Sequence, residues 1–191
     1  MMRIITGTAK GTRLASLEGD ATRPTSERVK EAVFSSIQFD VQGRVVLDLF
    51  AGSGQLGLEA LSRGAESVMF VDASPDAMAI VKENTKKTGF FDRCRYLISD
   101  YRSYLRKAAG RDAYHLIFLD PPYAQNLISE ALRRIVASKI AKPGCLIVCE
   151  GNSPSLFEED EALARQFEIV KEARYGITHI HILRLLGGEG A

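Results

Sequence analysis

The stretch Asp48-Leu49-Phe50-Ala51-Gly52-Ser53-Gly54 decides the fold of this chain. Residues 45–50 are a β-rich run that ends in these glycines, and residues 55–63 then carry apolar side chains on an expected helix, closed by Gly64. Glycine at such a junction lets the backbone turn sharply and approach a ligand closely. A strand, a glycine-rich loop and a helix in this order predict the first unit of a nucleotide-binding parallel sheet.

The alternation of strand and helix continues beyond that loop. A second β-rich run leads to Asp72, and Ser74-Pro75-Asp76 supplies a capping residue, a first-turn proline and an acid for the next helix. Such alternation predicts an α/β, Rossmann-like fold with a mainly parallel sheet and helices on both faces. Two last runs around Tyr175-Gly176 predict an antiparallel hairpin that completes seven strands. The expected strands are 45–50, 67–71, 95–98, 116–119, 145–149, 167–174 and 177–185, and the expected helices are 55–63, 74–88, 101–108 and 126–138.

The first forty residues differ from this pattern. Runs at 3–6 and 12–16 flank a turn at Lys10-Gly11 and predict a small β-hairpin, and a helix is expected over 26–37. This extension is too short to fold independently. The expected division is an N-terminal hairpin and helix extension over 1–40, one α/β domain over 41–186 and a frayed tail over 187–191.

The composition fits a single domain. The chain has 191 residues, 46% of them hydrophobic, and a net charge of +1, which excludes a polyelectrolyte-like nucleic-acid binder but allows local basic patches. No apolar run approaches the ~20 residues that span a membrane, and the start lacks a secretory signal. Cys145 and Cys149 should lie about 13 Å apart in a strand, too far for a disulfide. We therefore expect a cytoplasmic monomer with reduced thiols and no membrane association.

A second decisive motif is Asp120-Pro121-Pro122-Tyr123, which directly follows the apolar run 116–119. The prolines fix the backbone and remove two N–H donors, and the acid before them is held in extended geometry. The result is a rigid loop at the end of a strand, whose carboxylate and carbonyl can accept both N–H groups of a planar amine. Tyr123 can stack on the ring that carries the amine. These four residues are the candidate catalytic residues.

Acids at successive strand ends favour S-adenosylmethionine as the ligand of the glycine loop. Residues 52–57 also fit the dinucleotide pattern G-x-G-x-x-G, so an NAD-binding oxidoreductase is a distant alternative. S-adenosylmethionine has no phosphate; Asp48 suits its amine, and the loop N–H groups suit its carboxylate. Asp72 can accept from the ribose hydroxyls and Asp100 from the adenine amino group, although each acid could instead cap the following helix. The candidate cofactor-binding residues are Asp48, Phe50, Ala51, Gly52, Ser53, Gly54, Asp72, Ala73, Asp100 and Tyr101.

Together these motifs resemble the bacterial small-subunit ribosomal RNA guanine-N2 methyltransferases of the RsmD type, over nearly the whole chain. Some positions depart from the family pattern: Glu27 and Lys30 replace an aspartate and an arginine, and Ser35 stands where asparagine is common. The matching segments are Arg3-Ile4-Ile5, Lys10-Gly11, Thr22-Arg23-Pro24-Thr25-Ser26-Glu27-Arg28-Val29-Lys30-Glu31, residues 48–54 and 57–65, and Asp120-Pro121-Pro122-Tyr123.

The resemblance implies a class I methyltransferase that transfers a methyl group from S-adenosylmethionine to the exocyclic N2 of one guanine in small-subunit ribosomal RNA. It also implies an assembled or assembling subunit as the physical target. DNA adenine-N6 methyltransferases share Asp-Pro-Pro-Tyr but usually carry a separate target-recognition region, for which the N-terminal extension is too small. Protein-glutamine methyltransferases of this fold usually have asparagine in place of Asp120. Both activities stay open as alternatives.

The N-terminal extension is the expected RNA contact. Residues 1–30 hold six Lys or Arg residues, Lys30 included, against three Asp or Glu residues. Contacts of such residues with phosphates would orient RNA without specifying its sequence, and an ordinary solvated face is the alternative. Tyr175, in the hairpin turn, is a further candidate for substrate contact, whereas no Cys or His spacing predicts a metal site. The candidate RNA-binding residues are Arg3, Lys10, Arg13, Arg23, Thr25 and Arg28.

Overall fold

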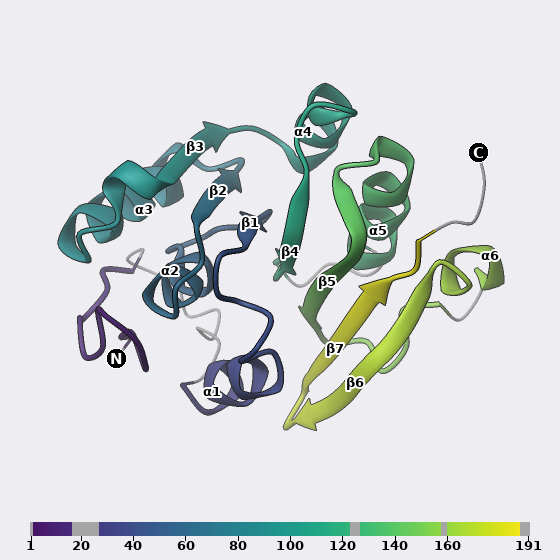
Figure 1. Ribbon diagram of the computed structural model, residues 1–191, viewed down its shortest axis with the longest axis horizontal. Coiled ribbons are helices and arrows are strands. Elements are labelled where there is room, and N and C mark those ends of the chain that lie inside the picture. The colour runs from purple at the N-terminus through teal and green to yellow at the C-terminus, as the bar shows by residue number, and fades with distance from the viewer. Residues whose placement is uncertain (1, 17–26, 123–126, 158–159, 188–191) are drawn as a thin grey trace.

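A computed structural model places the chain in three layers, with a twisted sheet between two sets of helices (Figure 1). It describes residues 2–16, 27–122, 127–157 and 160–187. Within these ranges the sheet has seven strands in the order β3-β2-β1-β4-β5-β7-β6. The first five strands are parallel, and β7 runs antiparallel between β5 and β6. The strands are β1 (Val45–Asp48), β2 (Ser67–Asp72), β3 (Cys94–Ile98), β4 (Tyr114–Leu119), β5 (Ala141–Gly151), β6 (Phe167–Tyr175) and β7 (Thr178–Leu185).

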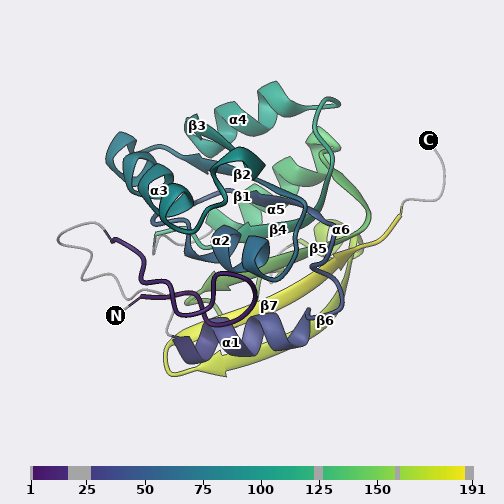
Figure 2. The same ribbon diagram turned by 60° about the vertical axis from the view of Figure 1, so that its left-hand side comes forward.

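The helices divide between the two faces of this sheet, and Figure 2 shows the arrangement turned by 60° from Figure 1. Side chains alternate along each strand, so Val46 and Phe118 pack beneath α1, α2 and α3, whereas Leu47 and Leu119 pack beneath α4, α5 and α6. The predicted α/β fold with a mainly parallel sheet ending in a hairpin is confirmed. The helices are α1 (Glu27–Ser36), α2 (Gln55–Ser62), α3 (Pro75–Lys87), α4 (Tyr101–Ala108), α5 (Leu127–Ser138) and α6 (Glu161–Ala164), with a short 3-10 helix η1 (Phe91–Arg93).

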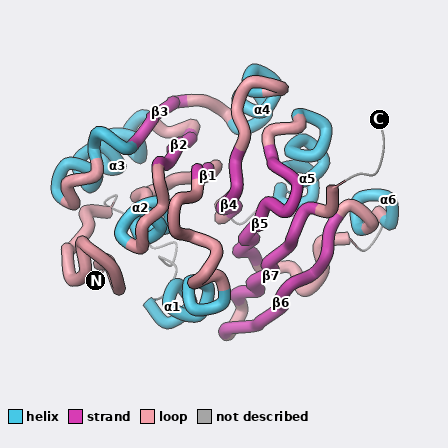
Figure 3. Tube along the Cα trace, viewed as in Figure 1, coloured by secondary structure: helices cyan, strands magenta, loops and turns pink. Residues whose placement is uncertain are grey.

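Two local expectations differ from the structure. The expected N-terminal hairpin is reduced to a single antiparallel bridge between Arg3 and Arg13, and Figure 3 shows its segments as loop. Strand β5 begins at Ala141, four residues before the expected start, and takes in the Lys142-Pro143-Gly144 turn. A register shift against β4 between Tyr114 and Leu116 accommodates these extra residues, as a β-bulge does.

The N-terminal segment packs on the same core as the sheet. Ile4 is fully buried and Leu14 nearly so, and both belong to the apolar cluster under α1, α2 and α3. The Ile4 N–H donates to the Thr12 carbonyl at 3.0 Å and the Leu14 N–H to the Met2 carbonyl at 3.0 Å, which keeps the two short segments together. The extension is thus anchored to the α/β domain through shared hydrophobic packing.

Candidate active site

Three of the predicted site acids lie at the carboxyl edge of the sheet. Asp48 ends β1, Asp72 ends β2 and Asp120 directly follows β4. Each lies two residues beyond an apolar side chain of the α1–α3 face, and alternation along the strand therefore turns all three toward that face. The pKa of Asp48 is raised to about 8. Burial is the main cause of this increase, and the negative charges of Asp120 and Asp72 contribute to it. The structure therefore brings these acids together in one place.

Two of these acids hold the glycine loop in place. The Gly52 N–H donates to Oδ2 of Asp72 at 2.8 Å, and Oδ1 of Asp72 accepts from the Ser74 N–H at 2.8 Å. The Gly57 N–H, in the first turn of α2, donates to Oδ2 of Asp48 at 3.0 Å. A Cβ added at Gly52 would meet nothing within 4 Å. The loop backbone thus lies against the acids and faces open space at Gly52.

The other glycines of this loop serve the backbone and the packing. Gly54 precedes α2 with a φ of 78°, a conformation that favours glycine, and its N–H donates to the Ala51 carbonyl at 2.7 Å. A Cβ on Gly57 would lie 2.4 Å from a ring carbon of Phe70, so only glycine lets α2 approach β2 this closely. Ala51 is buried beneath the loop, whereas Ala73 is exposed beside the acid that ends β2.

Asp100 and Tyr101 lie where α4 begins. Asp100 is exposed, and its Oδ1 accepts from the Arg102 N–H at 2.8 Å, which confirms the capping alternative; its contact with adenine stays a prediction. The ring centroids of Phe50 and Tyr101 are 5.2 Å apart, so the glycine loop and α4 share an aromatic contact. The Tyr101 hydroxyl donates to Glu130 of α5 at 2.8 Å. Burial is the first cause that raises the pKa of Tyr101 to about 12.

The proline motif begins at the end of β4, as predicted. Leu119 is the last residue of the strand, Asp120 is half-buried, Pro121 is buried and Pro122 is exposed. Tyr123 lies outside the described residues, so its stacking role stays a prediction. The carboxylate and the first proline of the motif therefore stand beside the glycine loop, at the same edge of the sheet.

Asn84 is a buried residue that the sequence reasoning missed. It lies on α3, and its Oδ1 accepts from the Ala15 N–H at 2.8 Å. Its Nδ2 donates to the carbonyls of Ala15 at 3.0 Å and Ser53 at 2.9 Å. The hydroxyl of Ser53 in turn donates to the Met2 sulfur at 3.1 Å. One amide thus connects the N-terminal segment to the glycine loop, and nothing in the local pattern around Asn84 indicates these partners.

A second missed element is the buried carboxylate of Glu59 on α2. It accepts from the N–H groups of Ile5 at 2.8 Å and Thr6 at 3.0 Å, and from the Arg63 guanidinium at 2.9 Å. The Lys30 ammonium lies 3.5 Å from the same carboxylate and is 1% exposed. Its desolvation lowers the pKa of Lys30. A buried ion network therefore fixes the N-terminal segment.

The predicted basic patch is smaller than its sequence suggests. The inclusion of Lys30 is wrong, because that side chain is buried against Glu59. The Arg3 guanidinium binds Glu27 at 3.0 Å. Arg13 lies opposite Arg3 in the N-terminal bridge. Arg23 and Thr25 lie outside the described residues. Of the residues predicted to contact RNA, those that the structure describes are all exposed, and they are Arg3, Lys10, Arg13 and Arg28.

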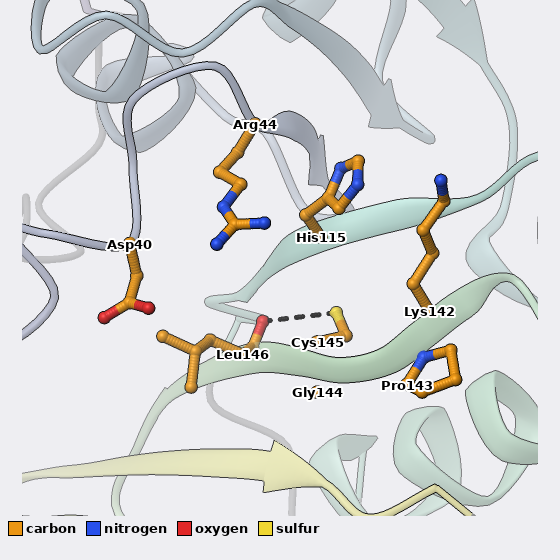
Figure 4. A pocket seen from close by; sticks show the side chains of 8 residues that line it. All are labelled: Asp40, Arg44, His115, Lys142, Pro143, Gly144, Cys145 and Leu146. Atoms are coloured by element: carbon orange, nitrogen blue, oxygen red, sulfur yellow. Dashed lines mark hydrogen bonds between the residues drawn. The ribbon is translucent and has the colours of Figure 1, made fainter.

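A pocket at the opposite edge of the sheet is too small for a nucleotide. It encloses about 30 Å³, room for one or two water molecules. Figure 4 shows Arg44, His115 and Lys142 at its wall, where β1, β4 and β5 begin. Burial, then the charges of Lys142 and Arg44, lower the pKa of His115, whose Nδ1 accepts from the Val45 N–H at 3.2 Å. This pocket lies apart from the site acids.

The histidine pair of β7 has structural partners. The rings of His179 and His181 stack with centroids 6.4 Å apart, and His181 contacts Glu172 at 3.0 Å and the Ser153 carbonyl at 3.2 Å. In the described ranges no three His, Cys, Asp or Glu side chains are grouped as metal ligands. No helix in those ranges is both long enough and apolar enough to cross a bilayer.

Comparisons with known proteins agree with this geometry. "Putative rRNA methyltransferase YlbH" of Bacillus subtilis is 35% identical over 97% of this chain and 100% of its own length. Ribosomal RNA small subunit methyltransferase D of Haemophilus influenzae is 31% identical over 93% of this chain and 90% of its own length. A solved structure, "Putative methyltransferase yhhF" from Escherichia coli, superposes with a TM-score of 0.82 at 25% identity, covering 98% of this chain and 99% of that one.

The family comparison covers the same length. Residues 2–184 match the family described as Conserved hypothetical protein 95, so the match includes both the N-terminal segment and the final hairpin. The resemblance inferred from the sequence motifs is therefore confirmed. The chain belongs to this family, the RsmD family, and has the class I methyltransferase fold.

Proposed function

We propose that this protein transfers a methyl group from S-adenosylmethionine to the exocyclic N2 of a guanine in small-subunit ribosomal RNA. One observation carries the proposal: Asp120, the first residue of the proline motif, lies beside an acid-lined glycine loop, on the same edge and face of the sheet. The curated relatives support ribosomal RNA as the substrate class, because one is a ribosomal RNA small subunit methyltransferase. The choice of guanine N2 rests on the motifs of the RsmD family.

The charge of the site favours S-adenosylmethionine over a dinucleotide. Asp48, Asp72 and Asp120 are close enough for their charges to raise the pKa of Asp48. A pyrophosphate placed beside the Asp72 and Asp120 carboxylates would be repelled, whereas a ligand with an ammonium group and a positive sulfur would be attracted and would favour the ionised form of Asp48. S-adenosylmethionine supplies, when bound, a methyl group attached to that positive sulfur. The proposal thus disfavours the NAD-binding alternative on electrostatic grounds.

The residues of the glycine loop fit such a ligand. The loop backbone at Gly52 faces open space, which allows its close approach to a carboxylate. Asp48 would hold the ammonium group, and Asp72 would accept from the ribose hydroxyls. Asp100, exposed at the start of α4, would accept from the adenine amino group. Phe50 and Tyr101, whose rings touch, would form the apolar wall beside it.

The proline motif would activate and orient the amine. An exocyclic amine is a poor nucleophile because its lone pair is delocalised into the ring. The Asp120 carboxylate and the Pro121 carbonyl can accept its two N–H groups, which localises the lone pair and aims it at the methyl group. Alignment of this kind supplies much of the rate enhancement. Asp120 need not be a strong base, because a proton leaves readily once the nitrogen is cationic.

The exposed basic residues would orient the RNA. Arg3, Lys10, Arg13 and Arg28 lie on the N-terminal segment and α1, and such residues bind phosphates without selecting a sequence. We place Arg23 and Thr25 in the same contact on the strength of the family motif. The Asp120 carboxylate and the Pro121 carbonyl together form what we call the amine clamp, and a base paired in a duplex would have to leave its stack to reach it. We infer that the protein acts as a monomer on an assembled or assembling subunit.

The test uses small ribosomal subunits from a strain that lacks this protein. Incubation with labelled S-adenosylmethionine and the protein should yield N2-methylguanosine in the small-subunit RNA, detected by mass spectrometry of nucleosides. Asp120→Ala should reduce this product roughly 100-fold or more while it still binds S-adenosylhomocysteine in calorimetry. Asp92→Asn, an exposed acid in η1, is the matched control and should keep full activity. Full activity of the Asp120→Ala variant would reject the assigned role.

Other products would distinguish the alternatives. N6-methyladenine in DNA or methylglutamine in protein, without a ribosomal product, would favour those two activities. Tight binding of NAD, without binding of S-adenosylhomocysteine, would reject a methyltransferase. All of these assays use the same purified protein, so the proposed activity and its three alternatives can be compared directly.

A further inference from the structure

Glu150 occupies a position beside the amine clamp. It lies one residue beyond Cys149 in β5, and Cys149 pairs in register with Leu119 of β4. Asp120 directly follows Leu119, the last residue of β4, so continuing the register by one residue places Asp120 next to Glu150. Neighbouring strands lie roughly 4.8 Å apart. The backbone positions that carry the two carboxyl groups are therefore adjacent at this edge of the sheet.

Both side chains point to the same face. Phe118 and Val148, two residues earlier in the two strands, belong to the core cluster under α1, α2 and α3, whereas Leu119 and Cys149 belong to the cluster on the other face. Alternation returns Asp120 and Glu150 to the first face, which is the face of the site acids. Glu150 is 8% exposed, so water screens its carboxyl group little.

The final hairpin, formed by β6 and β7, lies on the side of Glu150 that faces away from β4. Glu150 pairs with Ile180 of β7, and Ile180 belongs to the same core cluster. Tyr175 and Thr178, which flank the turn between β6 and β7, lie at this edge because β7 runs antiparallel to β5; Tyr175 packs against that cluster, and Thr178 is 7% exposed. The expected approach of Tyr175 to the substrate fits this arrangement. A planar base held by Asp120 would thus have Glu150 on its flank.

We propose that Glu150 accepts a hydrogen bond from N1–H of the target guanine and so selects guanine among the bases; this inference rests on the proposed function. Adenine, cytosine and guanine all carry an exocyclic amine. In adenine and cytosine the ring nitrogen beside that amine bears a lone pair, which a carboxylate repels. In guanine N1 bears a hydrogen, which a carboxylate accepts. A second carboxylate beside the amine clamp therefore fits guanine alone, and a site of this kind strongly rejects an analogue that lacks the donor.

The test combines an altered substrate with an altered side chain. 2-Aminopurine keeps the 2-amine but has a lone pair at N1 and lacks O6, so the response of a Glu150 variant is needed to assign the effect to N1. Small subunits are reconstituted with guanine or 2-aminopurine at the methylated position, which is first mapped with the wild-type protein. Glu150→Gln keeps the size of the side chain and gives it an amide that can donate to the 2-aminopurine N1. Glu168→Gln, on the exposed face of β6, removes the same charge elsewhere and is the matched control.

The wild-type protein should methylate the guanine subunit at least roughly 100-fold faster than the 2-aminopurine subunit. Glu150→Gln should lower that ratio at least tenfold, and Glu168→Gln should leave it unchanged. Equal rates on both substrates with the wild-type protein, or an unaltered ratio in Glu150→Gln, would overturn the inference. Equal wild-type rates overturn the inference even if the variant fails to fold, and the ratio in Glu150→Gln separates loss of the N1–H contact from loss of any contact with O6. Absence of N2-methylguanosine from the wild-type reaction would reject the proposed function itself, which is a separate result.

Discussion

Replacing Asn84 with alanine should destabilise the protein and weaken its hold on the cofactor at the same time. The side chain is fully buried and makes three hydrogen bonds with backbone groups, two to Ala15 and one to the Ser53 carbonyl. Ala15 is half-buried, so water can replace part of the hydrogen bonds that its backbone would lose. Ser53 is buried, so water replaces the hydrogen bond to its carbonyl less easily. An unsatisfied buried group costs about 1–3 kcal/mol.

The magnitude follows from these bonds. With one carbonyl left dry and a small cavity, the expected loss in the free energy of unfolding is about 3 kcal/mol. For a chain of this size each kcal/mol lowers the melting temperature by about 2–4 °C, so a decrease of about 6–12 °C is expected. Thermal and urea unfolding of the variant measure this loss. Asn152→Ala, at an exposed asparagine after β5, is the control and should melt within about 2 °C of the wild type.

The same variant has a functional consequence. Because the amide joins the N-terminal segment to the glycine loop, its loss should weaken S-adenosylhomocysteine binding by roughly tenfold, as expected for about 1.4 kcal/mol. Calorimetry below the melting range of the variant measures this effect separately from unfolding. A variant that melts with the wild type and binds S-adenosylhomocysteine equally well would refute the reasoning. Asn84 would then be a dispensable packing residue.

Three further predictions concern packing, charge and RNA. Gly57→Ala should lose about 1–3 kcal/mol of stability, because its Cβ would overlap a ring carbon that lies at 2.4 Å; unchanged urea unfolding would contradict the packing role. Asp48 has a raised pKa in the folded state, near 8, so its contribution to stability is present below about pH 4 and is lost as the pH rises through about 8. Asp48→Asn escapes this loss, and its melting temperature relative to the wild type should increase from pH 5 to pH 8; a constant difference would show that the carboxyl is not buried as described. Reversal of Arg3, Lys10 and Arg13 to Glu should weaken binding of small-subunit RNA at low salt and spare S-adenosylhomocysteine binding, and unaltered methylation would reject the basic patch.

The sequence predicted the fold because each strand and helix carries its own local signals. Ser74 caps α3 by accepting from the Ala77 N–H, as its position before Pro75 predicts. Ser67–Asp72 alternates between the two cores of the sheet. The start of β5 could not be predicted, since Pro143 and Gly144 favour a turn and only pairing with β4 keeps them in a bulged strand.

The site was predicted in part for the same reason. Asp48, Asp72 and Asp120 follow apolar runs, so strand topology alone brings them to one edge. The N-terminal partners of Glu59 and Asn84 are 53 to 69 residues away in sequence, and no local pattern indicates them. Burial of a lysine such as Lys30 likewise depends on a carboxylate from another helix. Glu150 carries the signal that found Asp120, an acid directly after a buried run, and it could have been found by the same reasoning.

The position of β7 between β5 and β6 constrains how this protein can be synthesised. Thr178–Leu185 is the last strand in the sequence, yet it forms hydrogen-bonded pairs with both β5 and β6. During translation β6 would therefore leave the ribosome before its neighbour exists, with its backbone amides exposed to other chains. A nascent chain halted before Thr178 should be vulnerable to aggregation and proteolysis, and the sheet can close only when this last strand is inserted.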